Sequence, residues 1–176
     1  MIPLVITFVG DDRPGLVNAI SERIAACGAT WLESRSAQLA GKFAGILRVD
    51  VPDANVAELE SSLRALAANG LRVAVEHGAA RPVEDTARVV TLSILGHERP
   101  GIVRDLTQAL KGLGVNIEEF SSGIERAPFT GAEMFRAEAR LRAPSGLALE
   151  DLRKTLERLA SELMVDLAVG EPETAA

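Results

Sequence analysis

The chain has 176 residues, of which 47% are hydrophobic, so it can form a packed core and is not expected to be disordered. Its formal charge is -6 and aromatic residues make up 3%, which argues against direct nucleic-acid binding, because such proteins need a cationic face and rings for stacking. One cysteine and two histidines exclude an internal disulfide and a clustered zinc site, and no cofactor or metal is expected.

The N-terminus resembles no targeting segment. It has neither the basic region nor the cleavage site of a secretory signal, and no apolar run is long enough to span a membrane. We therefore expect a cytoplasmic protein that does not bind membranes.

The first predicted strand ends at Val9 and is followed by a Gly-Asp-Asp-Arg-Pro-Gly turn and a helix. Gly10 is expected to permit a backbone geometry that is closed to other residues. Pro14 is expected to occupy the first helical position, where its missing N–H costs nothing. Asp11 or Asp12 is positioned to cap the helix. The turn thus predicts a helix N-terminus with free amides beside an open loop.

The elements after the turn complete a small α+β unit. The first helix has one apolar face, at Leu16, Val17, Ile20, Ile24 and Cys27, and Gly28 is expected to end it in a left-handed conformation. A two-stranded hairpin follows, then a helix with Leu59, Leu63 and Leu66 on one face and a strand over 71–75. This order predicts a ferredoxin-like βαββαβ unit, an antiparallel sheet with both helices on one face.

The second half of the chain repeats the first. The stretch LGHERPGIVRDL matches VGDDRPGLVNAI, and the turn recurs as Gly96, His97, Glu98, Arg99, Pro100 and Gly101. The apolar helix faces recur at Ile102, Val103, Leu106, Leu110 and Leu113 and at Leu152, Leu156 and Leu159. Additional residues at 125–130 predict a longer hairpin loop, and the last strand is predicted over 164–169.

Two ferredoxin-like units in tandem are therefore predicted. The first unit spans 1–78, an exposed linker 79–86, the second unit 87–170 and a flexible tail 171–176. Exposed edge strands in such small units invite pairing, so we expect the sheets to lie edge to edge or back to back, within the chain or across a homodimer.

Each turn suits a small ligand that carries both a negative and a positive charge. Helix amides near Gly15, and near Gly101 and Ile102, would bind a carboxylate, because a helix N-terminus carries a partial positive charge. Pro-Gly at such a turn is also common turn chemistry without a ligand.

Other residues of the turn favour the ligand interpretation. The carboxylates of Asp11, Asp12 and Glu98 could bind an ammonium group. Arg13 and Arg99 recur in both copies without an evident role in folding. Shared ancestry of the two copies would also preserve neutral residues, so the repeat by itself adds limited weight.

The segments GDDRPGLV and GHERPGIV, followed by CGATWLESRSAQLAGKF and LGVNIEEFSSG, resemble tandem ACT-domain proteins, most closely the glycine cleavage system transcriptional repressors. The resemblance covers roughly residues 3–170. It implies amino-acid binding at a junction between two ACT units. The positions it implies are Gly10 to Leu16 with Thr30, and Gly96 to Ile102 with Asn116. Thr30 departs from the asparagine usual in the family, so the second site is preferred.

The resemblance also implies a function. We expect an amino-acid-sensing regulatory protein without enzymatic activity, with glycine or a similar amino acid as its ligand. It would act through contact with a DNA-binding transcriptional regulator. The alternative is a regulatory subunit of an amino-acid metabolic enzyme.

Catalytic interpretations have less support. His97 would need a nucleophile and an orienting partner to act as a base, and the first copy has Asp11 in its place. An acylphosphatase-like enzyme on the same fold is a remote alternative, because the acidic residues of the turn would repel a phosphate.

Overall fold

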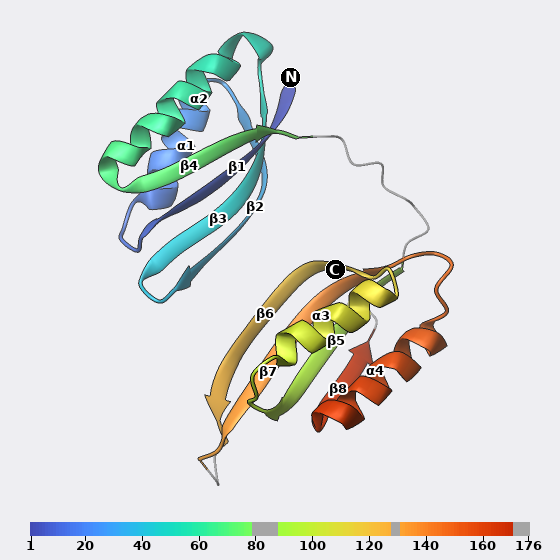
Figure 1. The fold of residues 1–176 in the computed structure, drawn as a ribbon. Coiled ribbons are helices and arrows are strands. Elements are labelled where there is room, and N and C mark those ends of the chain that lie inside the picture. Colours follow the sequence, from blue (N-terminus) through green and yellow to red (C-terminus); the bar gives the residue numbers. More distant parts are fainter. Residues whose placement is uncertain (79–87, 128–130, 171–176) are drawn as a thin grey trace. The chain divides into compact units, whose positions relative to one another are not determined.

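The computed structural model describes residues 1–78, 88–127 and 131–170 (Figure 1). The chain divides into two compact units, Met1–Pro82 and Val83–Ala176. Each contains a strand, a helix, two strands, a helix and a strand, which confirms the predicted ferredoxin-like order. The predicted linker 79–86 and tail 171–176 lie outside the described residues.

The first unit is one antiparallel sheet covered on one face by two helices (Figure 1). Its elements are β1 (Ile2–Asp11), α1 (Leu16–Ala26), β2 (Thr30–Leu39), β3 (Lys42–Val51), α2 (Val56–Arg64) and β4 (Leu71–His77). Short 3-10 helices at Asp53–Asn55 and Ala65–Asn69 flank α2. The strand order is β2-β3-β1-β4, so β2 and β4 form the edges.

The second unit has the same architecture. Its elements are β5 (Arg88–His97), α3 (Ile102–Gly112), β6 (Asn116–Arg126), β7 (Glu133–Ala143), α4 (Leu149–Leu163) and β8 (Val165–Gly170). The strand order is β6-β7-β5-β8, which places β6 at an edge beside β7.

Each unit has its own hydrophobic core between its sheet and its helices. Alternate residues of the central strands face the helices, among them Leu4 and Ile6 in β1 and Val90 and Leu92 in β5, all at most 1% exposed. The predicted apolar faces of the helices pack against them, except for Val17 and Val103, which are 44% and 37% exposed. Cys27 is buried as expected. No helix in the described part of the chain has the length and apolarity needed to cross a bilayer.

The structure corrects the predicted start of each helix. Helix α1 begins at Leu16, and Gly15 is its N-cap with a φ of +92°, so Pro14 lies in the preceding turn and not at the first helical position. No side chain caps either α1 or α3. Asp11 is the last residue of β1 and pairs with Lys42 instead. A left-handed glycine therefore turns the chain into the helix.

The role of Gly10 also differs from the prediction. Gly10 lies inside β1, and its conformation is one that other residues adopt. A Cβ at this position would lie 2.9 Å from the carbonyl oxygen of Gly70, and one at Gly96 would lie 2.3 Å from Val165 Cγ1. These glycines are needed because neighbouring atoms approach the backbone closely.

The predicted ends of helices and strands agree with the structure at some positions and differ at others. Gly28 and Gly114 are left-handed at the ends of α1 and α3, as predicted. The last strand begins at Val165, because Met164 is the left-handed C-cap of α4. Residues 125 and 126 belong to β6 and not to a loop, whereas 128–130 lie outside the described residues.

Candidate functional site

Each unit presents the N-terminus of its first helix at the predicted turn. The first intrahelical bond runs from the amide of Ala19 to Gly15 O, and from the amide of Asp105 to Gly101 O, each at 2.9 Å. The earlier amides of each helix have no intrahelical acceptor and point into the turn. In the second unit the first of them, Ile102 N, donates to Arg99 O at 3.4 Å.

The two turn arginines have structural partners, which corrects the expectation that they lack a role in folding. Arg13 Nη2 donates to Asn69 O at 2.7 Å, so it binds the chain that leads into β4. Arg99 Nη2 donates to Asp105 Oδ2 at 3.0 Å, so it binds the first turn of α3. The Nε atom of Arg99 is buried and has no hydrogen-bond partner in the described part of the chain.

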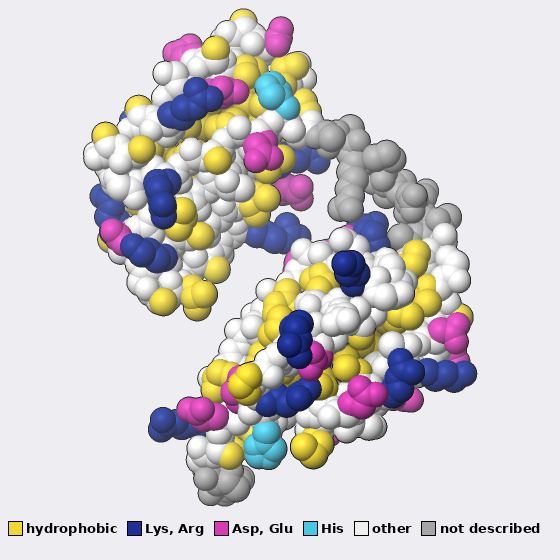
Figure 2. All heavy atoms as spheres, viewed as in Figure 1, with side chains coloured by type: hydrophobic (Ala, Val, Ile, Leu, Met, Phe, Trp, Pro, Cys, Tyr) yellow, Lys and Arg dark blue, Asp and Glu magenta, His cyan; other side chains and the backbone are white. Residues whose placement is uncertain are grey.

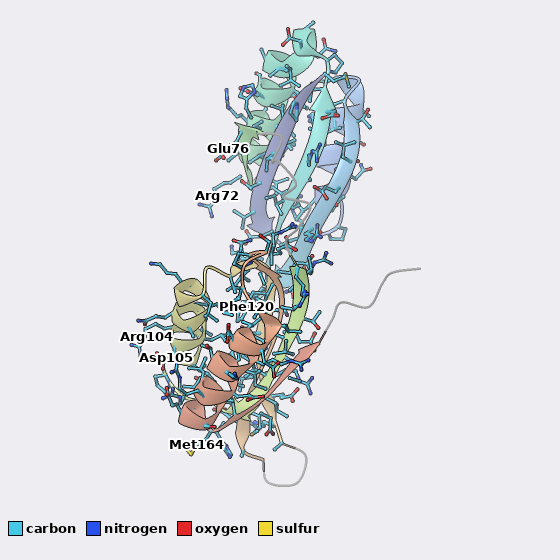
Figure 3. The ribbon with its side chains drawn as sticks, turned by 90° about the vertical axis from the view of Figure 1, so that its right-hand side faces the viewer. Arg72, Glu76, Arg104, Asp105, Phe120 and Met164 are labelled. Atoms are coloured by element: carbon cyan, nitrogen blue, oxygen red, sulfur yellow. The ribbon has the colours of Figure 1, made fainter. Side chains whose placement is uncertain are left out.

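A second arginine joins this network in the second unit. Arg104 Nη2 lies 2.8 Å from Asp105 Oδ1, and Figure 3 shows the two side chains together on α3. Asn18 and Ala19 occupy the matching positions of α1, so this network is specific to the second unit. Sequence reasoning missed it, although the difference between the two copies was the available signal.

A hollow of about 300 Å³ lies beside the second turn. It is lined by residues of the turn and α3, namely Glu98, Arg99, Gly101, Ile102, Val103 and Arg104, and of β6 and β7, namely Ser122, Gly123, Ile124 and Phe135. Four predicted residues therefore line it, whereas Gly96, His97 and Pro100 do not. The strand residues escaped prediction because they reach the turn only through sheet pairing, as when Ile124 pairs with Phe135.

The charges around this hollow are balanced. Arg99 and Arg104 contribute two positive charges, and Glu98 and the adjoining Asp105 contribute two negative charges. On the face of the second unit seen in Figure 2, basic and acidic side chains lie among hydrophobic ones without a patch of one sign. Such surroundings suit a zwitterion better than a phosphate, which needs a net positive site.

Asn116 lies at the other end of the unit. It pairs with Arg142, whereas Ile124, beside the hollow, pairs with Phe135. These partners are seven residues apart along β7, or about 23 Å at the rise of a strand. Thr30 has the same relation to the first turn, because it pairs with Asp50 and Gly10 pairs with Phe43. Within one unit the structure therefore does not bring Asn116 or Thr30 to the turn.

The first turn is surrounded by different side chains. Lys42 contacts Asp11, and its hydrogen bond and charge lower the pKa of that carboxyl. Phe8 lies over Gly45, where a Cβ would be 2.5 Å from Phe8 Cζ. The Phe8 ring centroid is 5.8 Å from that of Phe43. The second unit has Ile94 and Ala137 at the positions of Phe8 and Gly45, so it has no aromatic ring at this place.

Comparison with known proteins identifies the fold family. The sequence pattern of the ACT domain matches residues 3–76 and again 88–170. The chain belongs to the ACT-domain family. Its two units are therefore tandem ACT domains, as the resemblance implied.

Several relatives match most of this ACT protein. The glycine cleavage system transcriptional repressor of Escherichia coli (strain K12) is 26% identical over 161 residues, which cover 91% of this chain and 85% of that protein. A crystal structure of an unknown protein from Galdieria sulphuraria is 29% identical, with a TM-score of 0.87 over 97% of this chain and 98% of that chain.

One relative is an enzyme. Phosphoserine phosphatase SerB2 of Mycobacterium tuberculosis is 30% identical over 177 residues, which cover 97% of this chain and 41% of the phosphatase. Together the relatives support an ACT-type regulatory protein.

Proposed function

We propose that this chain is an amino-acid-sensing regulatory protein and that the second-unit turn binds a free amino acid. The observation that carries the proposal is the hollow beside α3, where helix amides, two arginines and two carboxylates adjoin with no net charge. Of the two turns, only the second has a carboxylate at the position of Asp105, since α1 has Ala19 there.

The proposed binding mode follows from this chemistry. The ligand carboxylate accepts hydrogen bonds from the amides of Val103 and Arg104 in the first turn of α3 and contacts the Arg104 guanidinium, which is exposed. The ligand ammonium group contacts the carboxylate of Glu98. Asp105 holds both arginines in position.

Calorimetry with the twenty amino acids tests this proposal. Glu98→Gln removes the negative charge that faces the ammonium group and is expected to weaken binding by on the order of ten-fold or more, because charge-assisted hydrogen bonds are the strong ones. Asp12→Asn makes the equivalent change in the first turn and is the control. Binding by none of the amino acids, or equal losses in the two variants, would contradict the assignment.

Asn116 contributes to this site only from another copy of the chain, because it lies far from its own turn. We therefore propose a homodimer in which one chain supplies the turn and the other supplies Asn116, in accord with the junction that the family resemblance implies. Mixing Glu98→Gln with Asn116→Ala should restore one of the two sites in each mixed dimer, or about a quarter of all sites when the chains mix at random. A mixture that binds no better than either variant alone would exclude the shared site.

The proposed action is protein contact and not direct DNA binding. The similarity to the glycine cleavage system repressor supports a DNA-binding regulator as the partner. The similarity to a phosphatase supports a second candidate, an ACT regulatory part of an amino-acid enzyme. A pull-down from lysate distinguishes them by whether a transcription factor or a metabolic enzyme is recovered, and tight binding of the pure protein to naked DNA would contradict both.

A further inference from the structure

We infer that the second-unit hollow selects an amino acid with a branched aliphatic side chain, such as leucine, isoleucine or valine, and discriminates against glycine. The inference rests on the proposed amino-acid site and names the ligand class that it takes. It concerns the wall of the hollow that faces away from the charged groups.

This wall is apolar and partly uncovered. Ile124 is 52% exposed and Val103 is 37% exposed, and both line the hollow. Phe135, which is 4% exposed, pairs with Ile124 and closes the same side. A ligand that covers exposed apolar side chains removes their surface from water, and this burial favours binding.

The fold does not require an apolar residue at position 124. In the first unit Gln38 occupies the same register, since it pairs with Phe43 as Ile124 pairs with Phe135. The first unit forms the same sheet with a polar residue at this place. The isoleucine is thus a feature of the site and not of sheet formation.

Size and charge narrow the ligand further. Glycine has no side chain and would leave Ile124 and Val103 uncovered in a hollow of about 300 Å³. A charged ligand side chain would disturb a group of residues whose charges already cancel. An aliphatic side chain covers the wall and leaves the charge balance unchanged.

The test compares substitutions at two isoleucine positions of the chain. Calorimetry on the full chain measures the binding of leucine, isoleucine, valine and glycine to each variant. Ile124→Gln copies the first unit. Ile46→Gln is the matched control, because Ile46 lies on β3 of the first unit and is 48% exposed. Val103→Thr, which keeps the shape of the side chain, is the second site variant in case Ile124→Gln lacks native circular dichroism.

We expect the wild-type chain to bind the best aliphatic ligand about ten-fold or more tightly than glycine. Ile124→Gln should remove this preference and change the glycine affinity by less than about two-fold, whereas Ile46→Gln should retain it. Glycine binding that equals or exceeds aliphatic binding in the wild-type chain would overturn this inference and leave the proposed function standing. A preference that survives in both site variants would also overturn it. Binding by none of the amino acids would overturn the proposed function itself.

Discussion

Arg99 in the turn after β5 donates a hydrogen bond to Asp105 in the first turn of α3, with 3.0 Å between Nη2 and Oδ2. Asp105 also pairs with Arg104, so one carboxylate holds the two arginines that line the hollow. The first unit has Ala19 in place of Asp105 and bonds its turn arginine to Asn69 O. The same turn is therefore held in two different ways.

Asp105→Asn should change both stability and ligand preference. The substitution leaves a net positive charge beside the hollow, so binding of an amino acid should weaken and binding of sulfate should strengthen. The free energy of unfolding should fall by about 0.5–1 kcal/mol, the range of a partly exposed ion pair. Asp151→Asn is the control, because it removes another first-turn carboxylate, in α4, and so makes a comparable change at a helix terminus. Equal effects of the two variants on binding would show that the arginine contacts do not matter.

Gly96→Ala should destabilise the second unit. The new Cβ would lie 2.3 Å from Val165 Cγ1 and 3.0 Å from Val165 Cα, so strand β8 must shift, at a cost of about 1–3 kcal/mol. The double variant with Val165→Ala should recover part of the loss in urea denaturation. Gly112→Ala is the control, because a Cβ there meets nothing within 4 Å, and it should stabilise α3 by about 0.5–1 kcal/mol. If Gly96→Ala left the free energy of unfolding unchanged, the close approach of Val165 to Gly96 would be contradicted.

Met164→Gly should stabilise the second unit by on the order of 1 kcal/mol. Met164 has a φ of +53° and an exposed fraction of 81%, so glycine relieves the left-handed strain and loses little packing (Figure 3). The first unit has Gly70, with a φ of +76°, after its own second helix, and Gly70→Met should destabilise that unit by a similar amount. Thermal unfolding of both variants measures the two changes in stability. A Met164→Gly variant that unfolds at a lower temperature than the wild-type chain would contradict the prediction.

Glu118 should make the free energy of unfolding depend on pH in the acid range. Burial raises its pKa, but the hydrogen bonds and charges of Arg142 and Arg140 outweigh burial and hold the pKa below its ordinary value of 4.5. A carboxyl whose pKa is lower in the folded state stabilises fully above its unfolded pKa, and this contribution is lost as the pH falls through the folded pKa.

Glu118→Gln should therefore lower stability at neutral pH and flatten its decline below about pH 4.5. Glu138→Gln, at an exposed carboxylate of β7 that lies 3.9 Å from Arg136, should change the pH profile little. Urea midpoints measured across pH decide the point. Parallel profiles for the wild-type chain and Glu118→Gln would contradict the role of this carboxylate.

Cys27 should react with alkylating reagents only after unfolding. The side chain is 3% exposed, and burial together with the charge of Glu58 raises the pKa of the thiol, so little reactive thiolate is available. Since it is the one cysteine of the chain, mass spectrometry after a pulse of iodoacetamide at increasing urea reports unfolding around α1. Rapid labelling without urea would contradict the burial.

The sequence alone determined the order of elements, the tandem repeat and the buried faces of the helices. These features depend on local periodicity and on residues such as Gly28 and Gly114, whose left-handed conformations end helices wherever the chain places them. It also located the turn that forms part of the candidate site. The ligand-binding roles given to the turn residues, Thr30 and Asn116 remain predictions.

Only the tertiary structure decided how that turn is used. Gly10 is required because Gly70, which lies just before β4, approaches its backbone closely, and not because of its backbone torsions. The wall of the hollow depends on sheet register, which brings Ser122 and Ile124 to the turn and carries Asn116 to the far end of the unit. Strand pairing joins residues that are distant in sequence, and no local pattern records which residues will meet.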